Sequence, residues 1–176
     1  YKRQPVPFAP SFYGLDFSEL PALIGAFAYG PVAGVMIEFC KILIKLVLKP
    51  SSTAFVGELA NFSISCMLVL PASVIYLFKK SRKQAILGTV VGTLIMTAFG
   101  SCFNAIYLLP KFSELYGIPL DAIIGMGTAI NPAIHSISGL VLMCVVPLNL
   151  LKGGLVSLIT ILVYKKLSPI LKAAHK

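Results

Sequence analysis

The chain has 176 residues, of which 57% are hydrophobic and only 12% are charged, and its mean hydropathy is +0.91. Soluble domains usually carry about 25% charged residues, so this chain lacks the polar surface that would cover a globule in water. The composition therefore argues against a disordered chain, a coiled coil and an ordinary soluble enzyme. A net charge of +9 is compatible with nucleic-acid binding, but the apolar content indicates a lipid bilayer as the solvent. We interpret the chain as an all-α integral membrane protein without a nucleic-acid partner.

Long uncharged windows predict five membrane helices in a single transmembrane domain, residues 1–176. A spanning helix needs about 20 mostly apolar residues. The expected elements are an external segment at 1–17, helices at about 18–29, 31–48, 53–79, 83–109 and 137–165, and an external loop at 110–135. Gly30-Pro31 separates the first two helices because proline fits the first turn of a helix and not its interior. The loop contains several prolines and glycines and has room for a short helix.

Two clusters of basic residues predict the orientation of the helices. One lies in the turn before the fourth helix and the other follows the last helix: Lys79, Lys80, Arg82 and Lys83, then Lys165, Lys166, Lys172 and Lys176. Basic residues near membrane helices concentrate on the cytoplasmic side, so we expect the C-terminus in the cytoplasm. Lys41 and Lys45 approach the external end of their helix, where lysine side chains can extend toward water.

Polar side chains recur inside three of these helices, where hydrocarbon makes them costly and where they usually mark function. They are Glu58, Asn61 and Ser65 in the third helix, Thr93, Thr97, Ser101 and Asn104 in the fourth, and Asn149 and Lys152 in the last. At a rise of 1.5 Å per residue, Asn61 lies roughly 12 Å, Asn104 roughly 8 Å and Lys152 roughly 15–20 Å from the external helix ends. The stripes therefore predict a polar pocket that opens to the outside. Two alternatives stay open: such residues also join helices to one another, and Glu58 can simply pair with Lys152.

Aromatic residues gather near the same external ends. They are Phe8, Phe12, Tyr13 and Phe17 in the first segment, and Phe55, Phe62, Phe103 and Tyr107 near the helix ends. Flat rings beside amides and charges suit a planar polar heterocycle. The alternative is a belt of aromatic residues at the membrane interface.

The sequence contains no pattern typical of a metal site or of a catalytic centre. Its four cysteines stand singly at wide spacings, which favours small buried thiols over metal ligands or disulfides. His135 has no spaced carboxylate partner, and no nucleotide-binding loop occurs. Gly88 and Gly92 form a G-x-x-x-G pattern, which predicts close packing on a helix of this chain or of a partner.

Several runs of residues resemble the substrate-capture subunits (S components) of energy-coupling factor (ECF) transporters, which take up vitamins. Leu15-Asp16-Phe17-Ser18-Glu19-Leu20-Pro21 and Gly30-Pro31-Val32-Ala33-Gly34 are similar to the family as a whole. Gly57-Glu58-Leu59-Ala60-Asn61-Phe62, Asn104 with Leu108-Leu109-Pro110, and Pro147-Leu148-Asn149-Leu150-Leu151-Lys152-Gly153 are similar to its riboflavin-specific members. The family fold has six spanning helices, and five are recognised here, so we expect the first helix to be absent from this chain.

The resemblance implies that Asn61, Asn104, Asn149 and Lys152 line a flavin pocket, capped by the external segment from Phe8 to Asp16. Together with the polar and aromatic residues above, the expected ligand-binding set is Asn61, Asn104, Asn149, Lys152, Glu58, Tyr107, Leu15 and Asp16. No metal and no cofactor is expected, because riboflavin is the transported ligand. The implied partners are a transmembrane coupling subunit and two ATPases.

The sequence thus predicts a riboflavin-binding membrane subunit of an ATP-driven importer and not an enzyme. Two alternatives stay open. One is an S component for thiamine, folate or pantothenate. The other is a small membrane enzyme that uses Glu58 or His135 as acid or base, which the lack of a spaced second catalytic residue disfavours.

Overall fold

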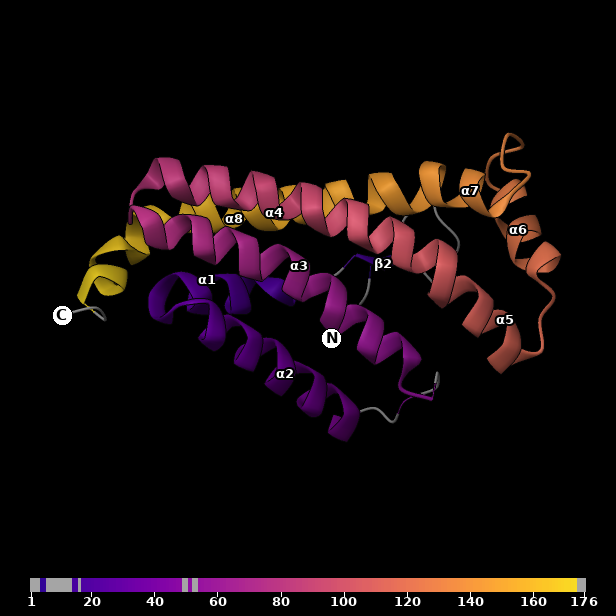
Figure 1. Cartoon of the computed structure of the whole chain (residues 1–176), viewed down its shortest axis with the longest axis horizontal. Helices are drawn as coiled ribbons and strands as arrows, with labels where there is room; N and C mark the ends of the chain where they lie inside the picture. The colour runs from indigo at the N-terminus through magenta and orange to yellow at the C-terminus, as the bar shows by residue number, and fades with distance from the viewer. Residues whose placement is uncertain (1–3, 6–13, 16, 49–50, 52–53, 174–176) are drawn as a thin grey trace.

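The computed structural model describes residues 4–5, 14–15, 17–48, 51 and 54–173, with side chains for residues 17–48, 51 and 54–163. Its elements are β1 (Gln4–Pro5), β2 (Gly14–Leu15), α1 (Glu19–Tyr29), α2 (Pro31–Leu48), α3 (Val56–Phe78), α4 (Arg82–Phe103), the π-helical segment η1 (Asn104–Leu108), α5 (Leu109–Tyr116), α6 (Leu120–Thr128), α7 (Ile137–Leu140), the π-helical segment η2 (Val141–Val145) and α8 (Val146–Ala173). Figure 1 shows an elongated bundle in which α3, α4 and α8 run along the long axis and the α1–α2 hairpin lies beside α3.

The α1–α2 hairpin turns at Gly30. The Gly30 N–H donates to the Ala26 carbonyl at 2.9 Å, and Gly30 then adopts a φ of 96°. Glycine enters this region of φ without the clash that a Cβ would cause. Pro31 follows as the first residue of α2, where its missing N–H costs nothing. With only 11 residues, α1 is too short to cross a bilayer unaided.

The helices α3 and α4 approach each other closely at two glycines. A Cβ placed on Gly88 would lie 2.5 Å from the Ala72 carbonyl oxygen, and one on Gly92 would lie 2.5 Å from that of Leu68. Small residues let two helix backbones approach in this way. The G-x-x-x-G face therefore packs on a helix of the same chain, which decides between the two options that the sequence left open.

Three helix limits differ from the predicted ones by more than one residue. The last helix ends at Ala173 and not at about 165. The third helix begins at Val56 and not at 53, because Phe55 takes a left-handed φ of 66° and its N–H is bound by the Ser51 hydroxyl at 3.0 Å. The fourth helix does not end at 109 but continues through η1 and α5 to Tyr116. Pro110 is tolerated because it enters at the second position of α5, just after the π turn.

The last helix contains a second π turn. α7, η2 and α8 form one continuous helix, and Pro147 again comes two residues after the π segment. The region expected as an external loop therefore holds the last two turns of a long helix, the separate helix α6 and a short link into α7. π turns inside α-helices are often found at functional sites.

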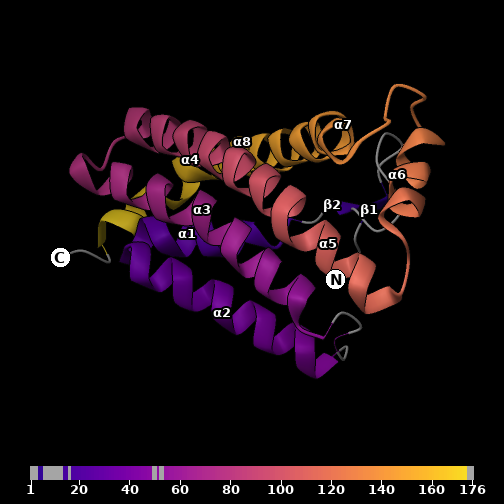
Figure 2. The ribbon, with the colours of Figure 1, turned by 45° about the vertical axis from the view of Figure 1, so that its right-hand side comes forward.

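Length and composition identify the helices that are suited to a membrane. Among the described residues, three stretches are long and apolar enough to cross one: Val56–Phe78, Arg82–Tyr116 and Ile137–Val163. α2 carries three charged side chains, Glu38, Lys41 and Lys45, within its apolar sequence. The α3–α4 turn lies at the same end of the molecule as the C-terminus, whereas α5, α6 and the β1–β2 ladder lie toward the other end (Figures 1 and 2).

Two apolar clusters hold the bundle. The larger one joins α1, α3, α4 and α8 through buried residues such as Phe27, Tyr76, Met96 and Val156. Phe27 and Tyr76 also contact each other through their rings, whose centroids are 4.6 Å apart. The second cluster joins α5, α6, α7 and η2 at the opposite end. The polar residues described next lie outside both clusters.

Candidate functional site

A buried carboxylate on α1 lies at the centre of a cluster of polar side chains. Glu19 is fully buried, and its Oε1 lies 2.6 Å from the ammonium of Lys152 on α8 and 2.8 Å from the hydroxyl of Ser65 on α3. The ammonium of Lys41 on α2 lies 3.8 Å from the same oxygen. Four helices therefore meet at one carboxylate oxygen.

The cluster continues along α2 to a second carboxylate. Glu38 is fully buried, and its Oε2 lies 2.5 Å from the Lys41 ammonium, one turn away on the same helix. A charge transferred into a low-dielectric interior costs several kcal/mol unless it is paired. Glu19, Glu38, Lys41 and Lys152 satisfy this condition together because they supply two negative and two positive charges.

Asparagine side chains of η1 and α8 both lie beside Gly100 of α4. Asn104 is buried and donates from Nδ2 to the Gly100 carbonyl at 2.7 Å. A Cβ on Gly100 would lie 2.8 Å from Nδ2 of Asn149, so glycine at this position lets the Asn149 amide lie against α4. Asn149 and Lys152 are three residues apart and share a face of α8. The amides therefore border the ion cluster.

The structure places Asn104 deeper than predicted. Because its helix runs on to Tyr116, Asn104 lies about 18 Å from that end of the helix and not roughly 8 Å as expected. Asn149 lies at a similar distance, about 18 Å, from the start of α7 at Ile137. The longer helix thus explains why both amides lie beside Gly100.

Hydroxyl groups of the predicted polar stripe are mostly occupied by their own helices. Thr97 donates to the carbonyl of Thr93, and Ser101 donates to that of Thr97, both at 2.7 Å. The Thr93 hydroxyl lies 3.3 Å from that of Ser157 on α8, where Gly153 allows close approach. Of these three hydroxyls, that of Thr93 joins α4 to α8, as one of the two alternatives for the stripe expected.

Glu58 belongs to a different ion pair from the one considered in the sequence. Its Oε1 lies 2.9 Å from the ammonium of Lys45 on α2, and its Oε2 accepts from the Ser51 hydroxyl at 2.8 Å. The alternative in which Glu58 pairs with Lys152 is therefore wrong, because Lys152 contacts Glu19. Glu58 instead ties the start of α3 to α2 and to the loop between them.

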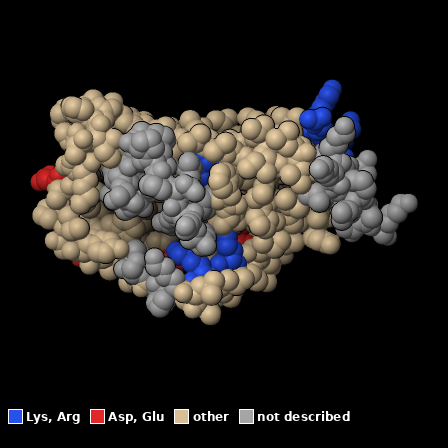
Figure 3. Space-filling model, turned by 180° about the vertical axis from the view of Figure 1, so that it is seen from behind, with Lys and Arg blue, Asp and Glu red and all other residues tan. Residues whose placement is uncertain are grey.

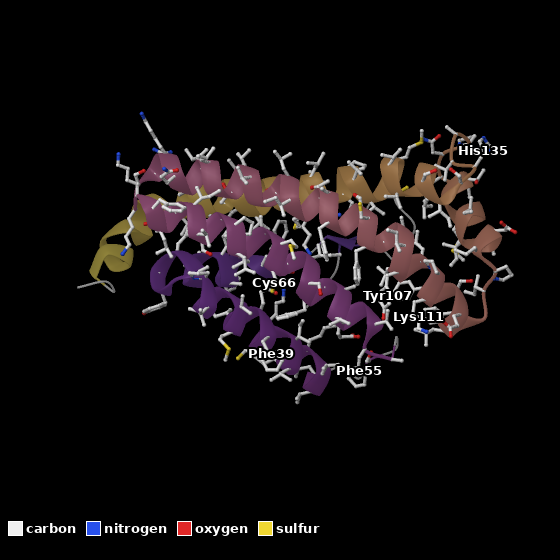
Figure 4. The ribbon with its side chains drawn as sticks, viewed as in Figure 1. Phe39, Phe55, Cys66, Tyr107, Lys111 and His135 are labelled. Carbon is white, nitrogen blue, oxygen red and sulfur yellow. The ribbon has the colours of Figure 1, made fainter. Side chains whose placement is uncertain are left out.

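Other members of the expected set lie around this centre. Asn61 is half-buried on α3, and Tyr107 is 40% exposed on η1, with its ring 5.1 Å from that of Phe103. Tyr107 lies toward the end of the bundle that carries Lys111 (Figure 4). The backbone of Leu15 pairs with Gln4 in the β ladder. Asp16, the Leu15 side chain and the segment from Phe8 onward lie outside the described residues.

One face of the molecule carries basic side chains beside a hollow (Figure 3). Seen from behind, the molecule has a hollow on this face, and basic side chains gather along its lower edge (Figure 3). The side chains of Lys41 and Lys45 on α2 are 15% and 19% exposed. α2 therefore turns ammonium groups inward from two successive turns, and the expectation that these lysines simply extend toward external water is wrong.

The residues considered for enzyme chemistry do not come together. His135 is exposed between α6 and α7, whereas Glu58 follows Phe55 at the start of α3; Figure 4 shows His135 and Phe55 well apart. None of the four cysteines, all within the described residues, forms a disulfide. Cys40 and Cys102 are exposed, so the expectation of buried thiols holds only for Cys66 and Cys144. No group of three metal-ligating side chains occurs among the described residues.

Sequence reasoning missed Glu19, Glu38 and Lys41. Glu19 was named only within the run that resembles the family, and Lys41 was expected to extend toward water from the end of its helix. The signal that could have found them is the spacing of Glu38 and Lys41, three residues apart within an otherwise apolar helix.

Comparison with known proteins gives consistent matches over nearly the whole chain. The family model for the ECF transporter, substrate-specific component, matches residues 4–164. The riboflavin transporter RibU of Staphylococcus aureus (strain TCH60) is 33% identical over 168 residues, which cover 96% of this chain and 82% of the relative. The riboflavin transporter FmnP of Bacillus subtilis (strain 168) is 30% identical and covers 94% and 82% of the two chains.

A solved structure also matches the fold. It is described as the structure and mechanism of the S component of a bacterial ECF transporter, and it superposes with a TM-score of 0.71 at 34% identity. The match covers 97% of this chain and 86% of the other. The all-α membrane architecture expected from the sequence is thereby confirmed.

Proposed function

The chain belongs to the substrate-specific components of ECF transporters, and from this premise we propose that it captures riboflavin at the outer face of the plasma membrane for ATP-driven uptake. Members of this family are transporter components, so the expectation that the chain is not an enzyme is confirmed. Two relatives at 30–33% identity are riboflavin transporters, which supports riboflavin as the ligand.

The observation that carries the proposal is the buried polar centre between α1, α4 and α8. Asn149 and Lys152 are 6% and 8% exposed, and Glu19 is fully buried beside them. Sites for small molecules combine apolar walls with a few fixed polar groups, and the polar ring edge of a flavin needs such groups. We assign Asn61, Asn104, Asn149 and Lys152 to the walls of the pocket. Glu58, Tyr107, Leu15 and Asp16 are assigned to its outer rim.

The proposal includes the partners and the orientation. The subunit works with a transmembrane coupling protein and two ATPases, and its C-terminus lies in the cytoplasm. The basic turn between α3 and α4 and the C-terminus lie at one end of the bundle, which supports this orientation (Figure 1).

Quenching of riboflavin fluorescence by the purified protein tests the ligand assignment. We expect saturable quenching that thiamine, folate and pantothenate do not reverse. Asn149→Ala is expected to weaken binding at least tenfold, because it removes a buried amide from the site. The matched control is Asn131→Ala, which removes an exposed amide beyond α6 and leaves affinity unchanged. A colourless protein that does not quench riboflavin, or one that binds another of the vitamins instead, contradicts the proposal.

A further inference from the structure

Two π turns lie against each other in neighbouring helices. η1 continues α4, η2 continues α7, and the two segments are in contact. In each segment a backbone N–H reaches back five residues and not four. Leu109 donates to the Asn104 carbonyl, and Val146 donates to the Val141 carbonyl. Because π turns are frequent causes of bends in helices, two helices are interrupted at the same level of the bundle.

A proline follows each π turn at the same distance. Pro110 and Pro147 are both the second residue after their π segment. Proline has no N–H, so neither residue can donate a hydrogen bond to the turn before it. Each of the two helices thus combines a widened turn with a missing donor. Pro71 lies inside α3, which contains no π turn, and therefore offers a comparison within the same chain.

The apolar packing divides at the level of the π turns. One cluster lies among α1, α3, α4 and α8, and the other lies mainly in α5, α6, α7 and η2. The two clusters share no residue. We call α5, α6 and α7, residues 109–140, the end unit, and α1, α3, α4 and α8 the bundle body (Figures 1 and 2). The end unit has apolar packing of its own, so it can keep its shape when it moves.

The contact of the end unit with α3 is small. Phe112 of α5 is only partly buried and packs at the edge of a cluster that Val56 and Ala60 form with Leu108. The ion pair between Lys111 and Glu114 joins two residues of α5 and not two helices. Within the part of the chain whose side chains are described, the end unit is therefore held mainly through η1 and η2.

The π turns lie at the level of the amides of the polar centre. Asn104 is the first residue of η1, and Asn149 follows Pro147 by two residues. Both amides lie beside Gly100 of α4. A movement of the end unit at the π turns therefore takes place directly beside these amides.

We propose that η1 and η2 form a double hinge, on which the end unit swings as one body to open and close the way to the polar centre. Two attachment points define one axis of rotation, whereas a single interrupted helix would also let the end unit twist. The larger apolar cluster keeps the bundle body fixed during this movement. The part of the proposal that concerns ligand access rests on riboflavin capture as the proposed function, and the movement itself does not.

Spin labels on the two sides of the hinge test the movement. Cys40 and Cys102 are replaced by alanine, and labels are attached through Asp121→Cys on α6 and Leu158→Cys on α8, both at exposed positions. We expect double electron–electron resonance to give a broad distance distribution without ligand and a narrow one with riboflavin. A second pair, Leu59→Cys with Leu158→Cys, lies within the bundle body and is expected to give the same narrow distribution in both states.

Restoring the missing donors tests whether the π turns are the hinge. The variant Pro110→Ala/Pro147→Ala supplies an N–H to the turn before each position. We expect a narrow distance across the hinge even without ligand, and riboflavin association slowed by about tenfold or more because the end unit moves less readily. The matched control, Pro71→Ala, restores a donor in α3, leaves both π turns unchanged and is expected to behave like the wild type.

Each outcome supports or overturns the double hinge. A single narrow distance between positions 121 and 158 of the wild type, with and without riboflavin, overturns it and needs no proline variant. An equally broad distribution for positions 59 and 158 places the movement elsewhere and also overturns it. So does a distribution in Pro110→Ala/Pro147→Ala as broad as in the wild type, or an equal narrowing by Pro71→Ala. A wild-type protein that moves across the hinge but binds no riboflavin supports the hinge and refutes the proposed function.

Discussion

Because α3 and α4 are in close contact at Gly88, we predict that adding a single methyl group there destabilises the fold. Gly88→Ala places a Cβ 2.5 Å from the Ala72 carbonyl oxygen and 3.2 Å from two further backbone atoms of that residue. An ordinary contact of this kind begins near 3.4 Å, so the helices must separate by roughly 0.9 Å. Backbone atoms cannot rotate away as a side chain would. We expect a loss of about 1–3 kcal/mol in the free energy of unfolding, the usual cost of overpacking.

The matched control is Gly154→Ala on α8. A Cβ at this position has no neighbour within 4 Å, so the substitution adds helix propensity without a clash. We expect it to be neutral or to stabilise by up to about 1 kcal/mol. For a chain of this size, 1 kcal/mol corresponds to about 2–4 °C, so Gly88→Ala is expected to melt roughly 2–12 °C below the wild type.

Thermal unfolding in detergent measures both variants, with a thiol-reactive fluorophore as the probe. Cys40 and Cys102 are first replaced by alanine because they are exposed, which leaves the buried Cys66 and Cys144 to report unfolding. Riboflavin affinity of the folded Gly88→Ala protein serves as a second readout and is expected to stay near that of the wild type. If Gly88→Ala melts at or above the temperature of Gly154→Ala, the assigned α3–α4 contact is wrong.

Three further predictions concern the buried charges and the thiols. Lys152→Met is expected to destabilise the protein by about 3–5 kcal/mol because it leaves the Glu19 charge without its nearest cation. Adding Glu19→Gln to this variant is expected to restore much of the lost stability. If the losses of the two substitutions simply add in the double variant, the pairing is contradicted. Lys45→Met is expected to cost about 1–3 kcal/mol in the same melting assay, because the buried Glu58 carboxylate loses its ion pair with Lys45. An unchanged melting temperature would show that the pair contributes nothing. In the folded wild type, the exposed Cys40 and Cys102 are expected to react with a membrane-permeant maleimide at least about tenfold faster than the two buried cysteines. Peptide mapping by mass spectrometry measures the labelling of each cysteine. Equal labelling of all four would refute the assigned packing.

The helix boundaries that could be predicted are those marked by strong local signals. Gly30-Pro31 combines a residue that tolerates a positive φ with one that begins a helix, and the boundary lies where the sequence placed it. The end of the fourth helix was predicted at Pro110 for the same reason, and this was wrong. A π turn widens the helix before the proline, and hydrophobic periodicity contains no signal for it.

Half of the polar centre could be inferred from depth along the helices. Asn104, Asn149 and Lys152 are buried as expected, because polar groups inside an apolar helix must find protein partners. Their contacts depend on how helices that are far apart in the sequence pack against one another. The pattern of polar and apolar residues along one chain carries no information on that packing. Glu19 and Lys152, for example, are 133 positions apart and only the bundle brings them within 2.6 Å.

The buried ion pairs contain equal numbers of acidic and basic side chains, and this balance has an electrical consequence. Glu19, Glu38 and Glu58 carry three negative charges, and their contacts Lys41, Lys45 and Lys152 carry three positive ones. A charge moved across a membrane exchanges about 2.3 kcal/mol of work per 100 mV of membrane potential. Because these six charges sum to zero, the core of the subunit can change its depth or tilt with almost no work against that potential. The voltage of the cell then neither drives nor opposes the movement of this core, and a neutral ligand such as a vitamin adds nothing to it.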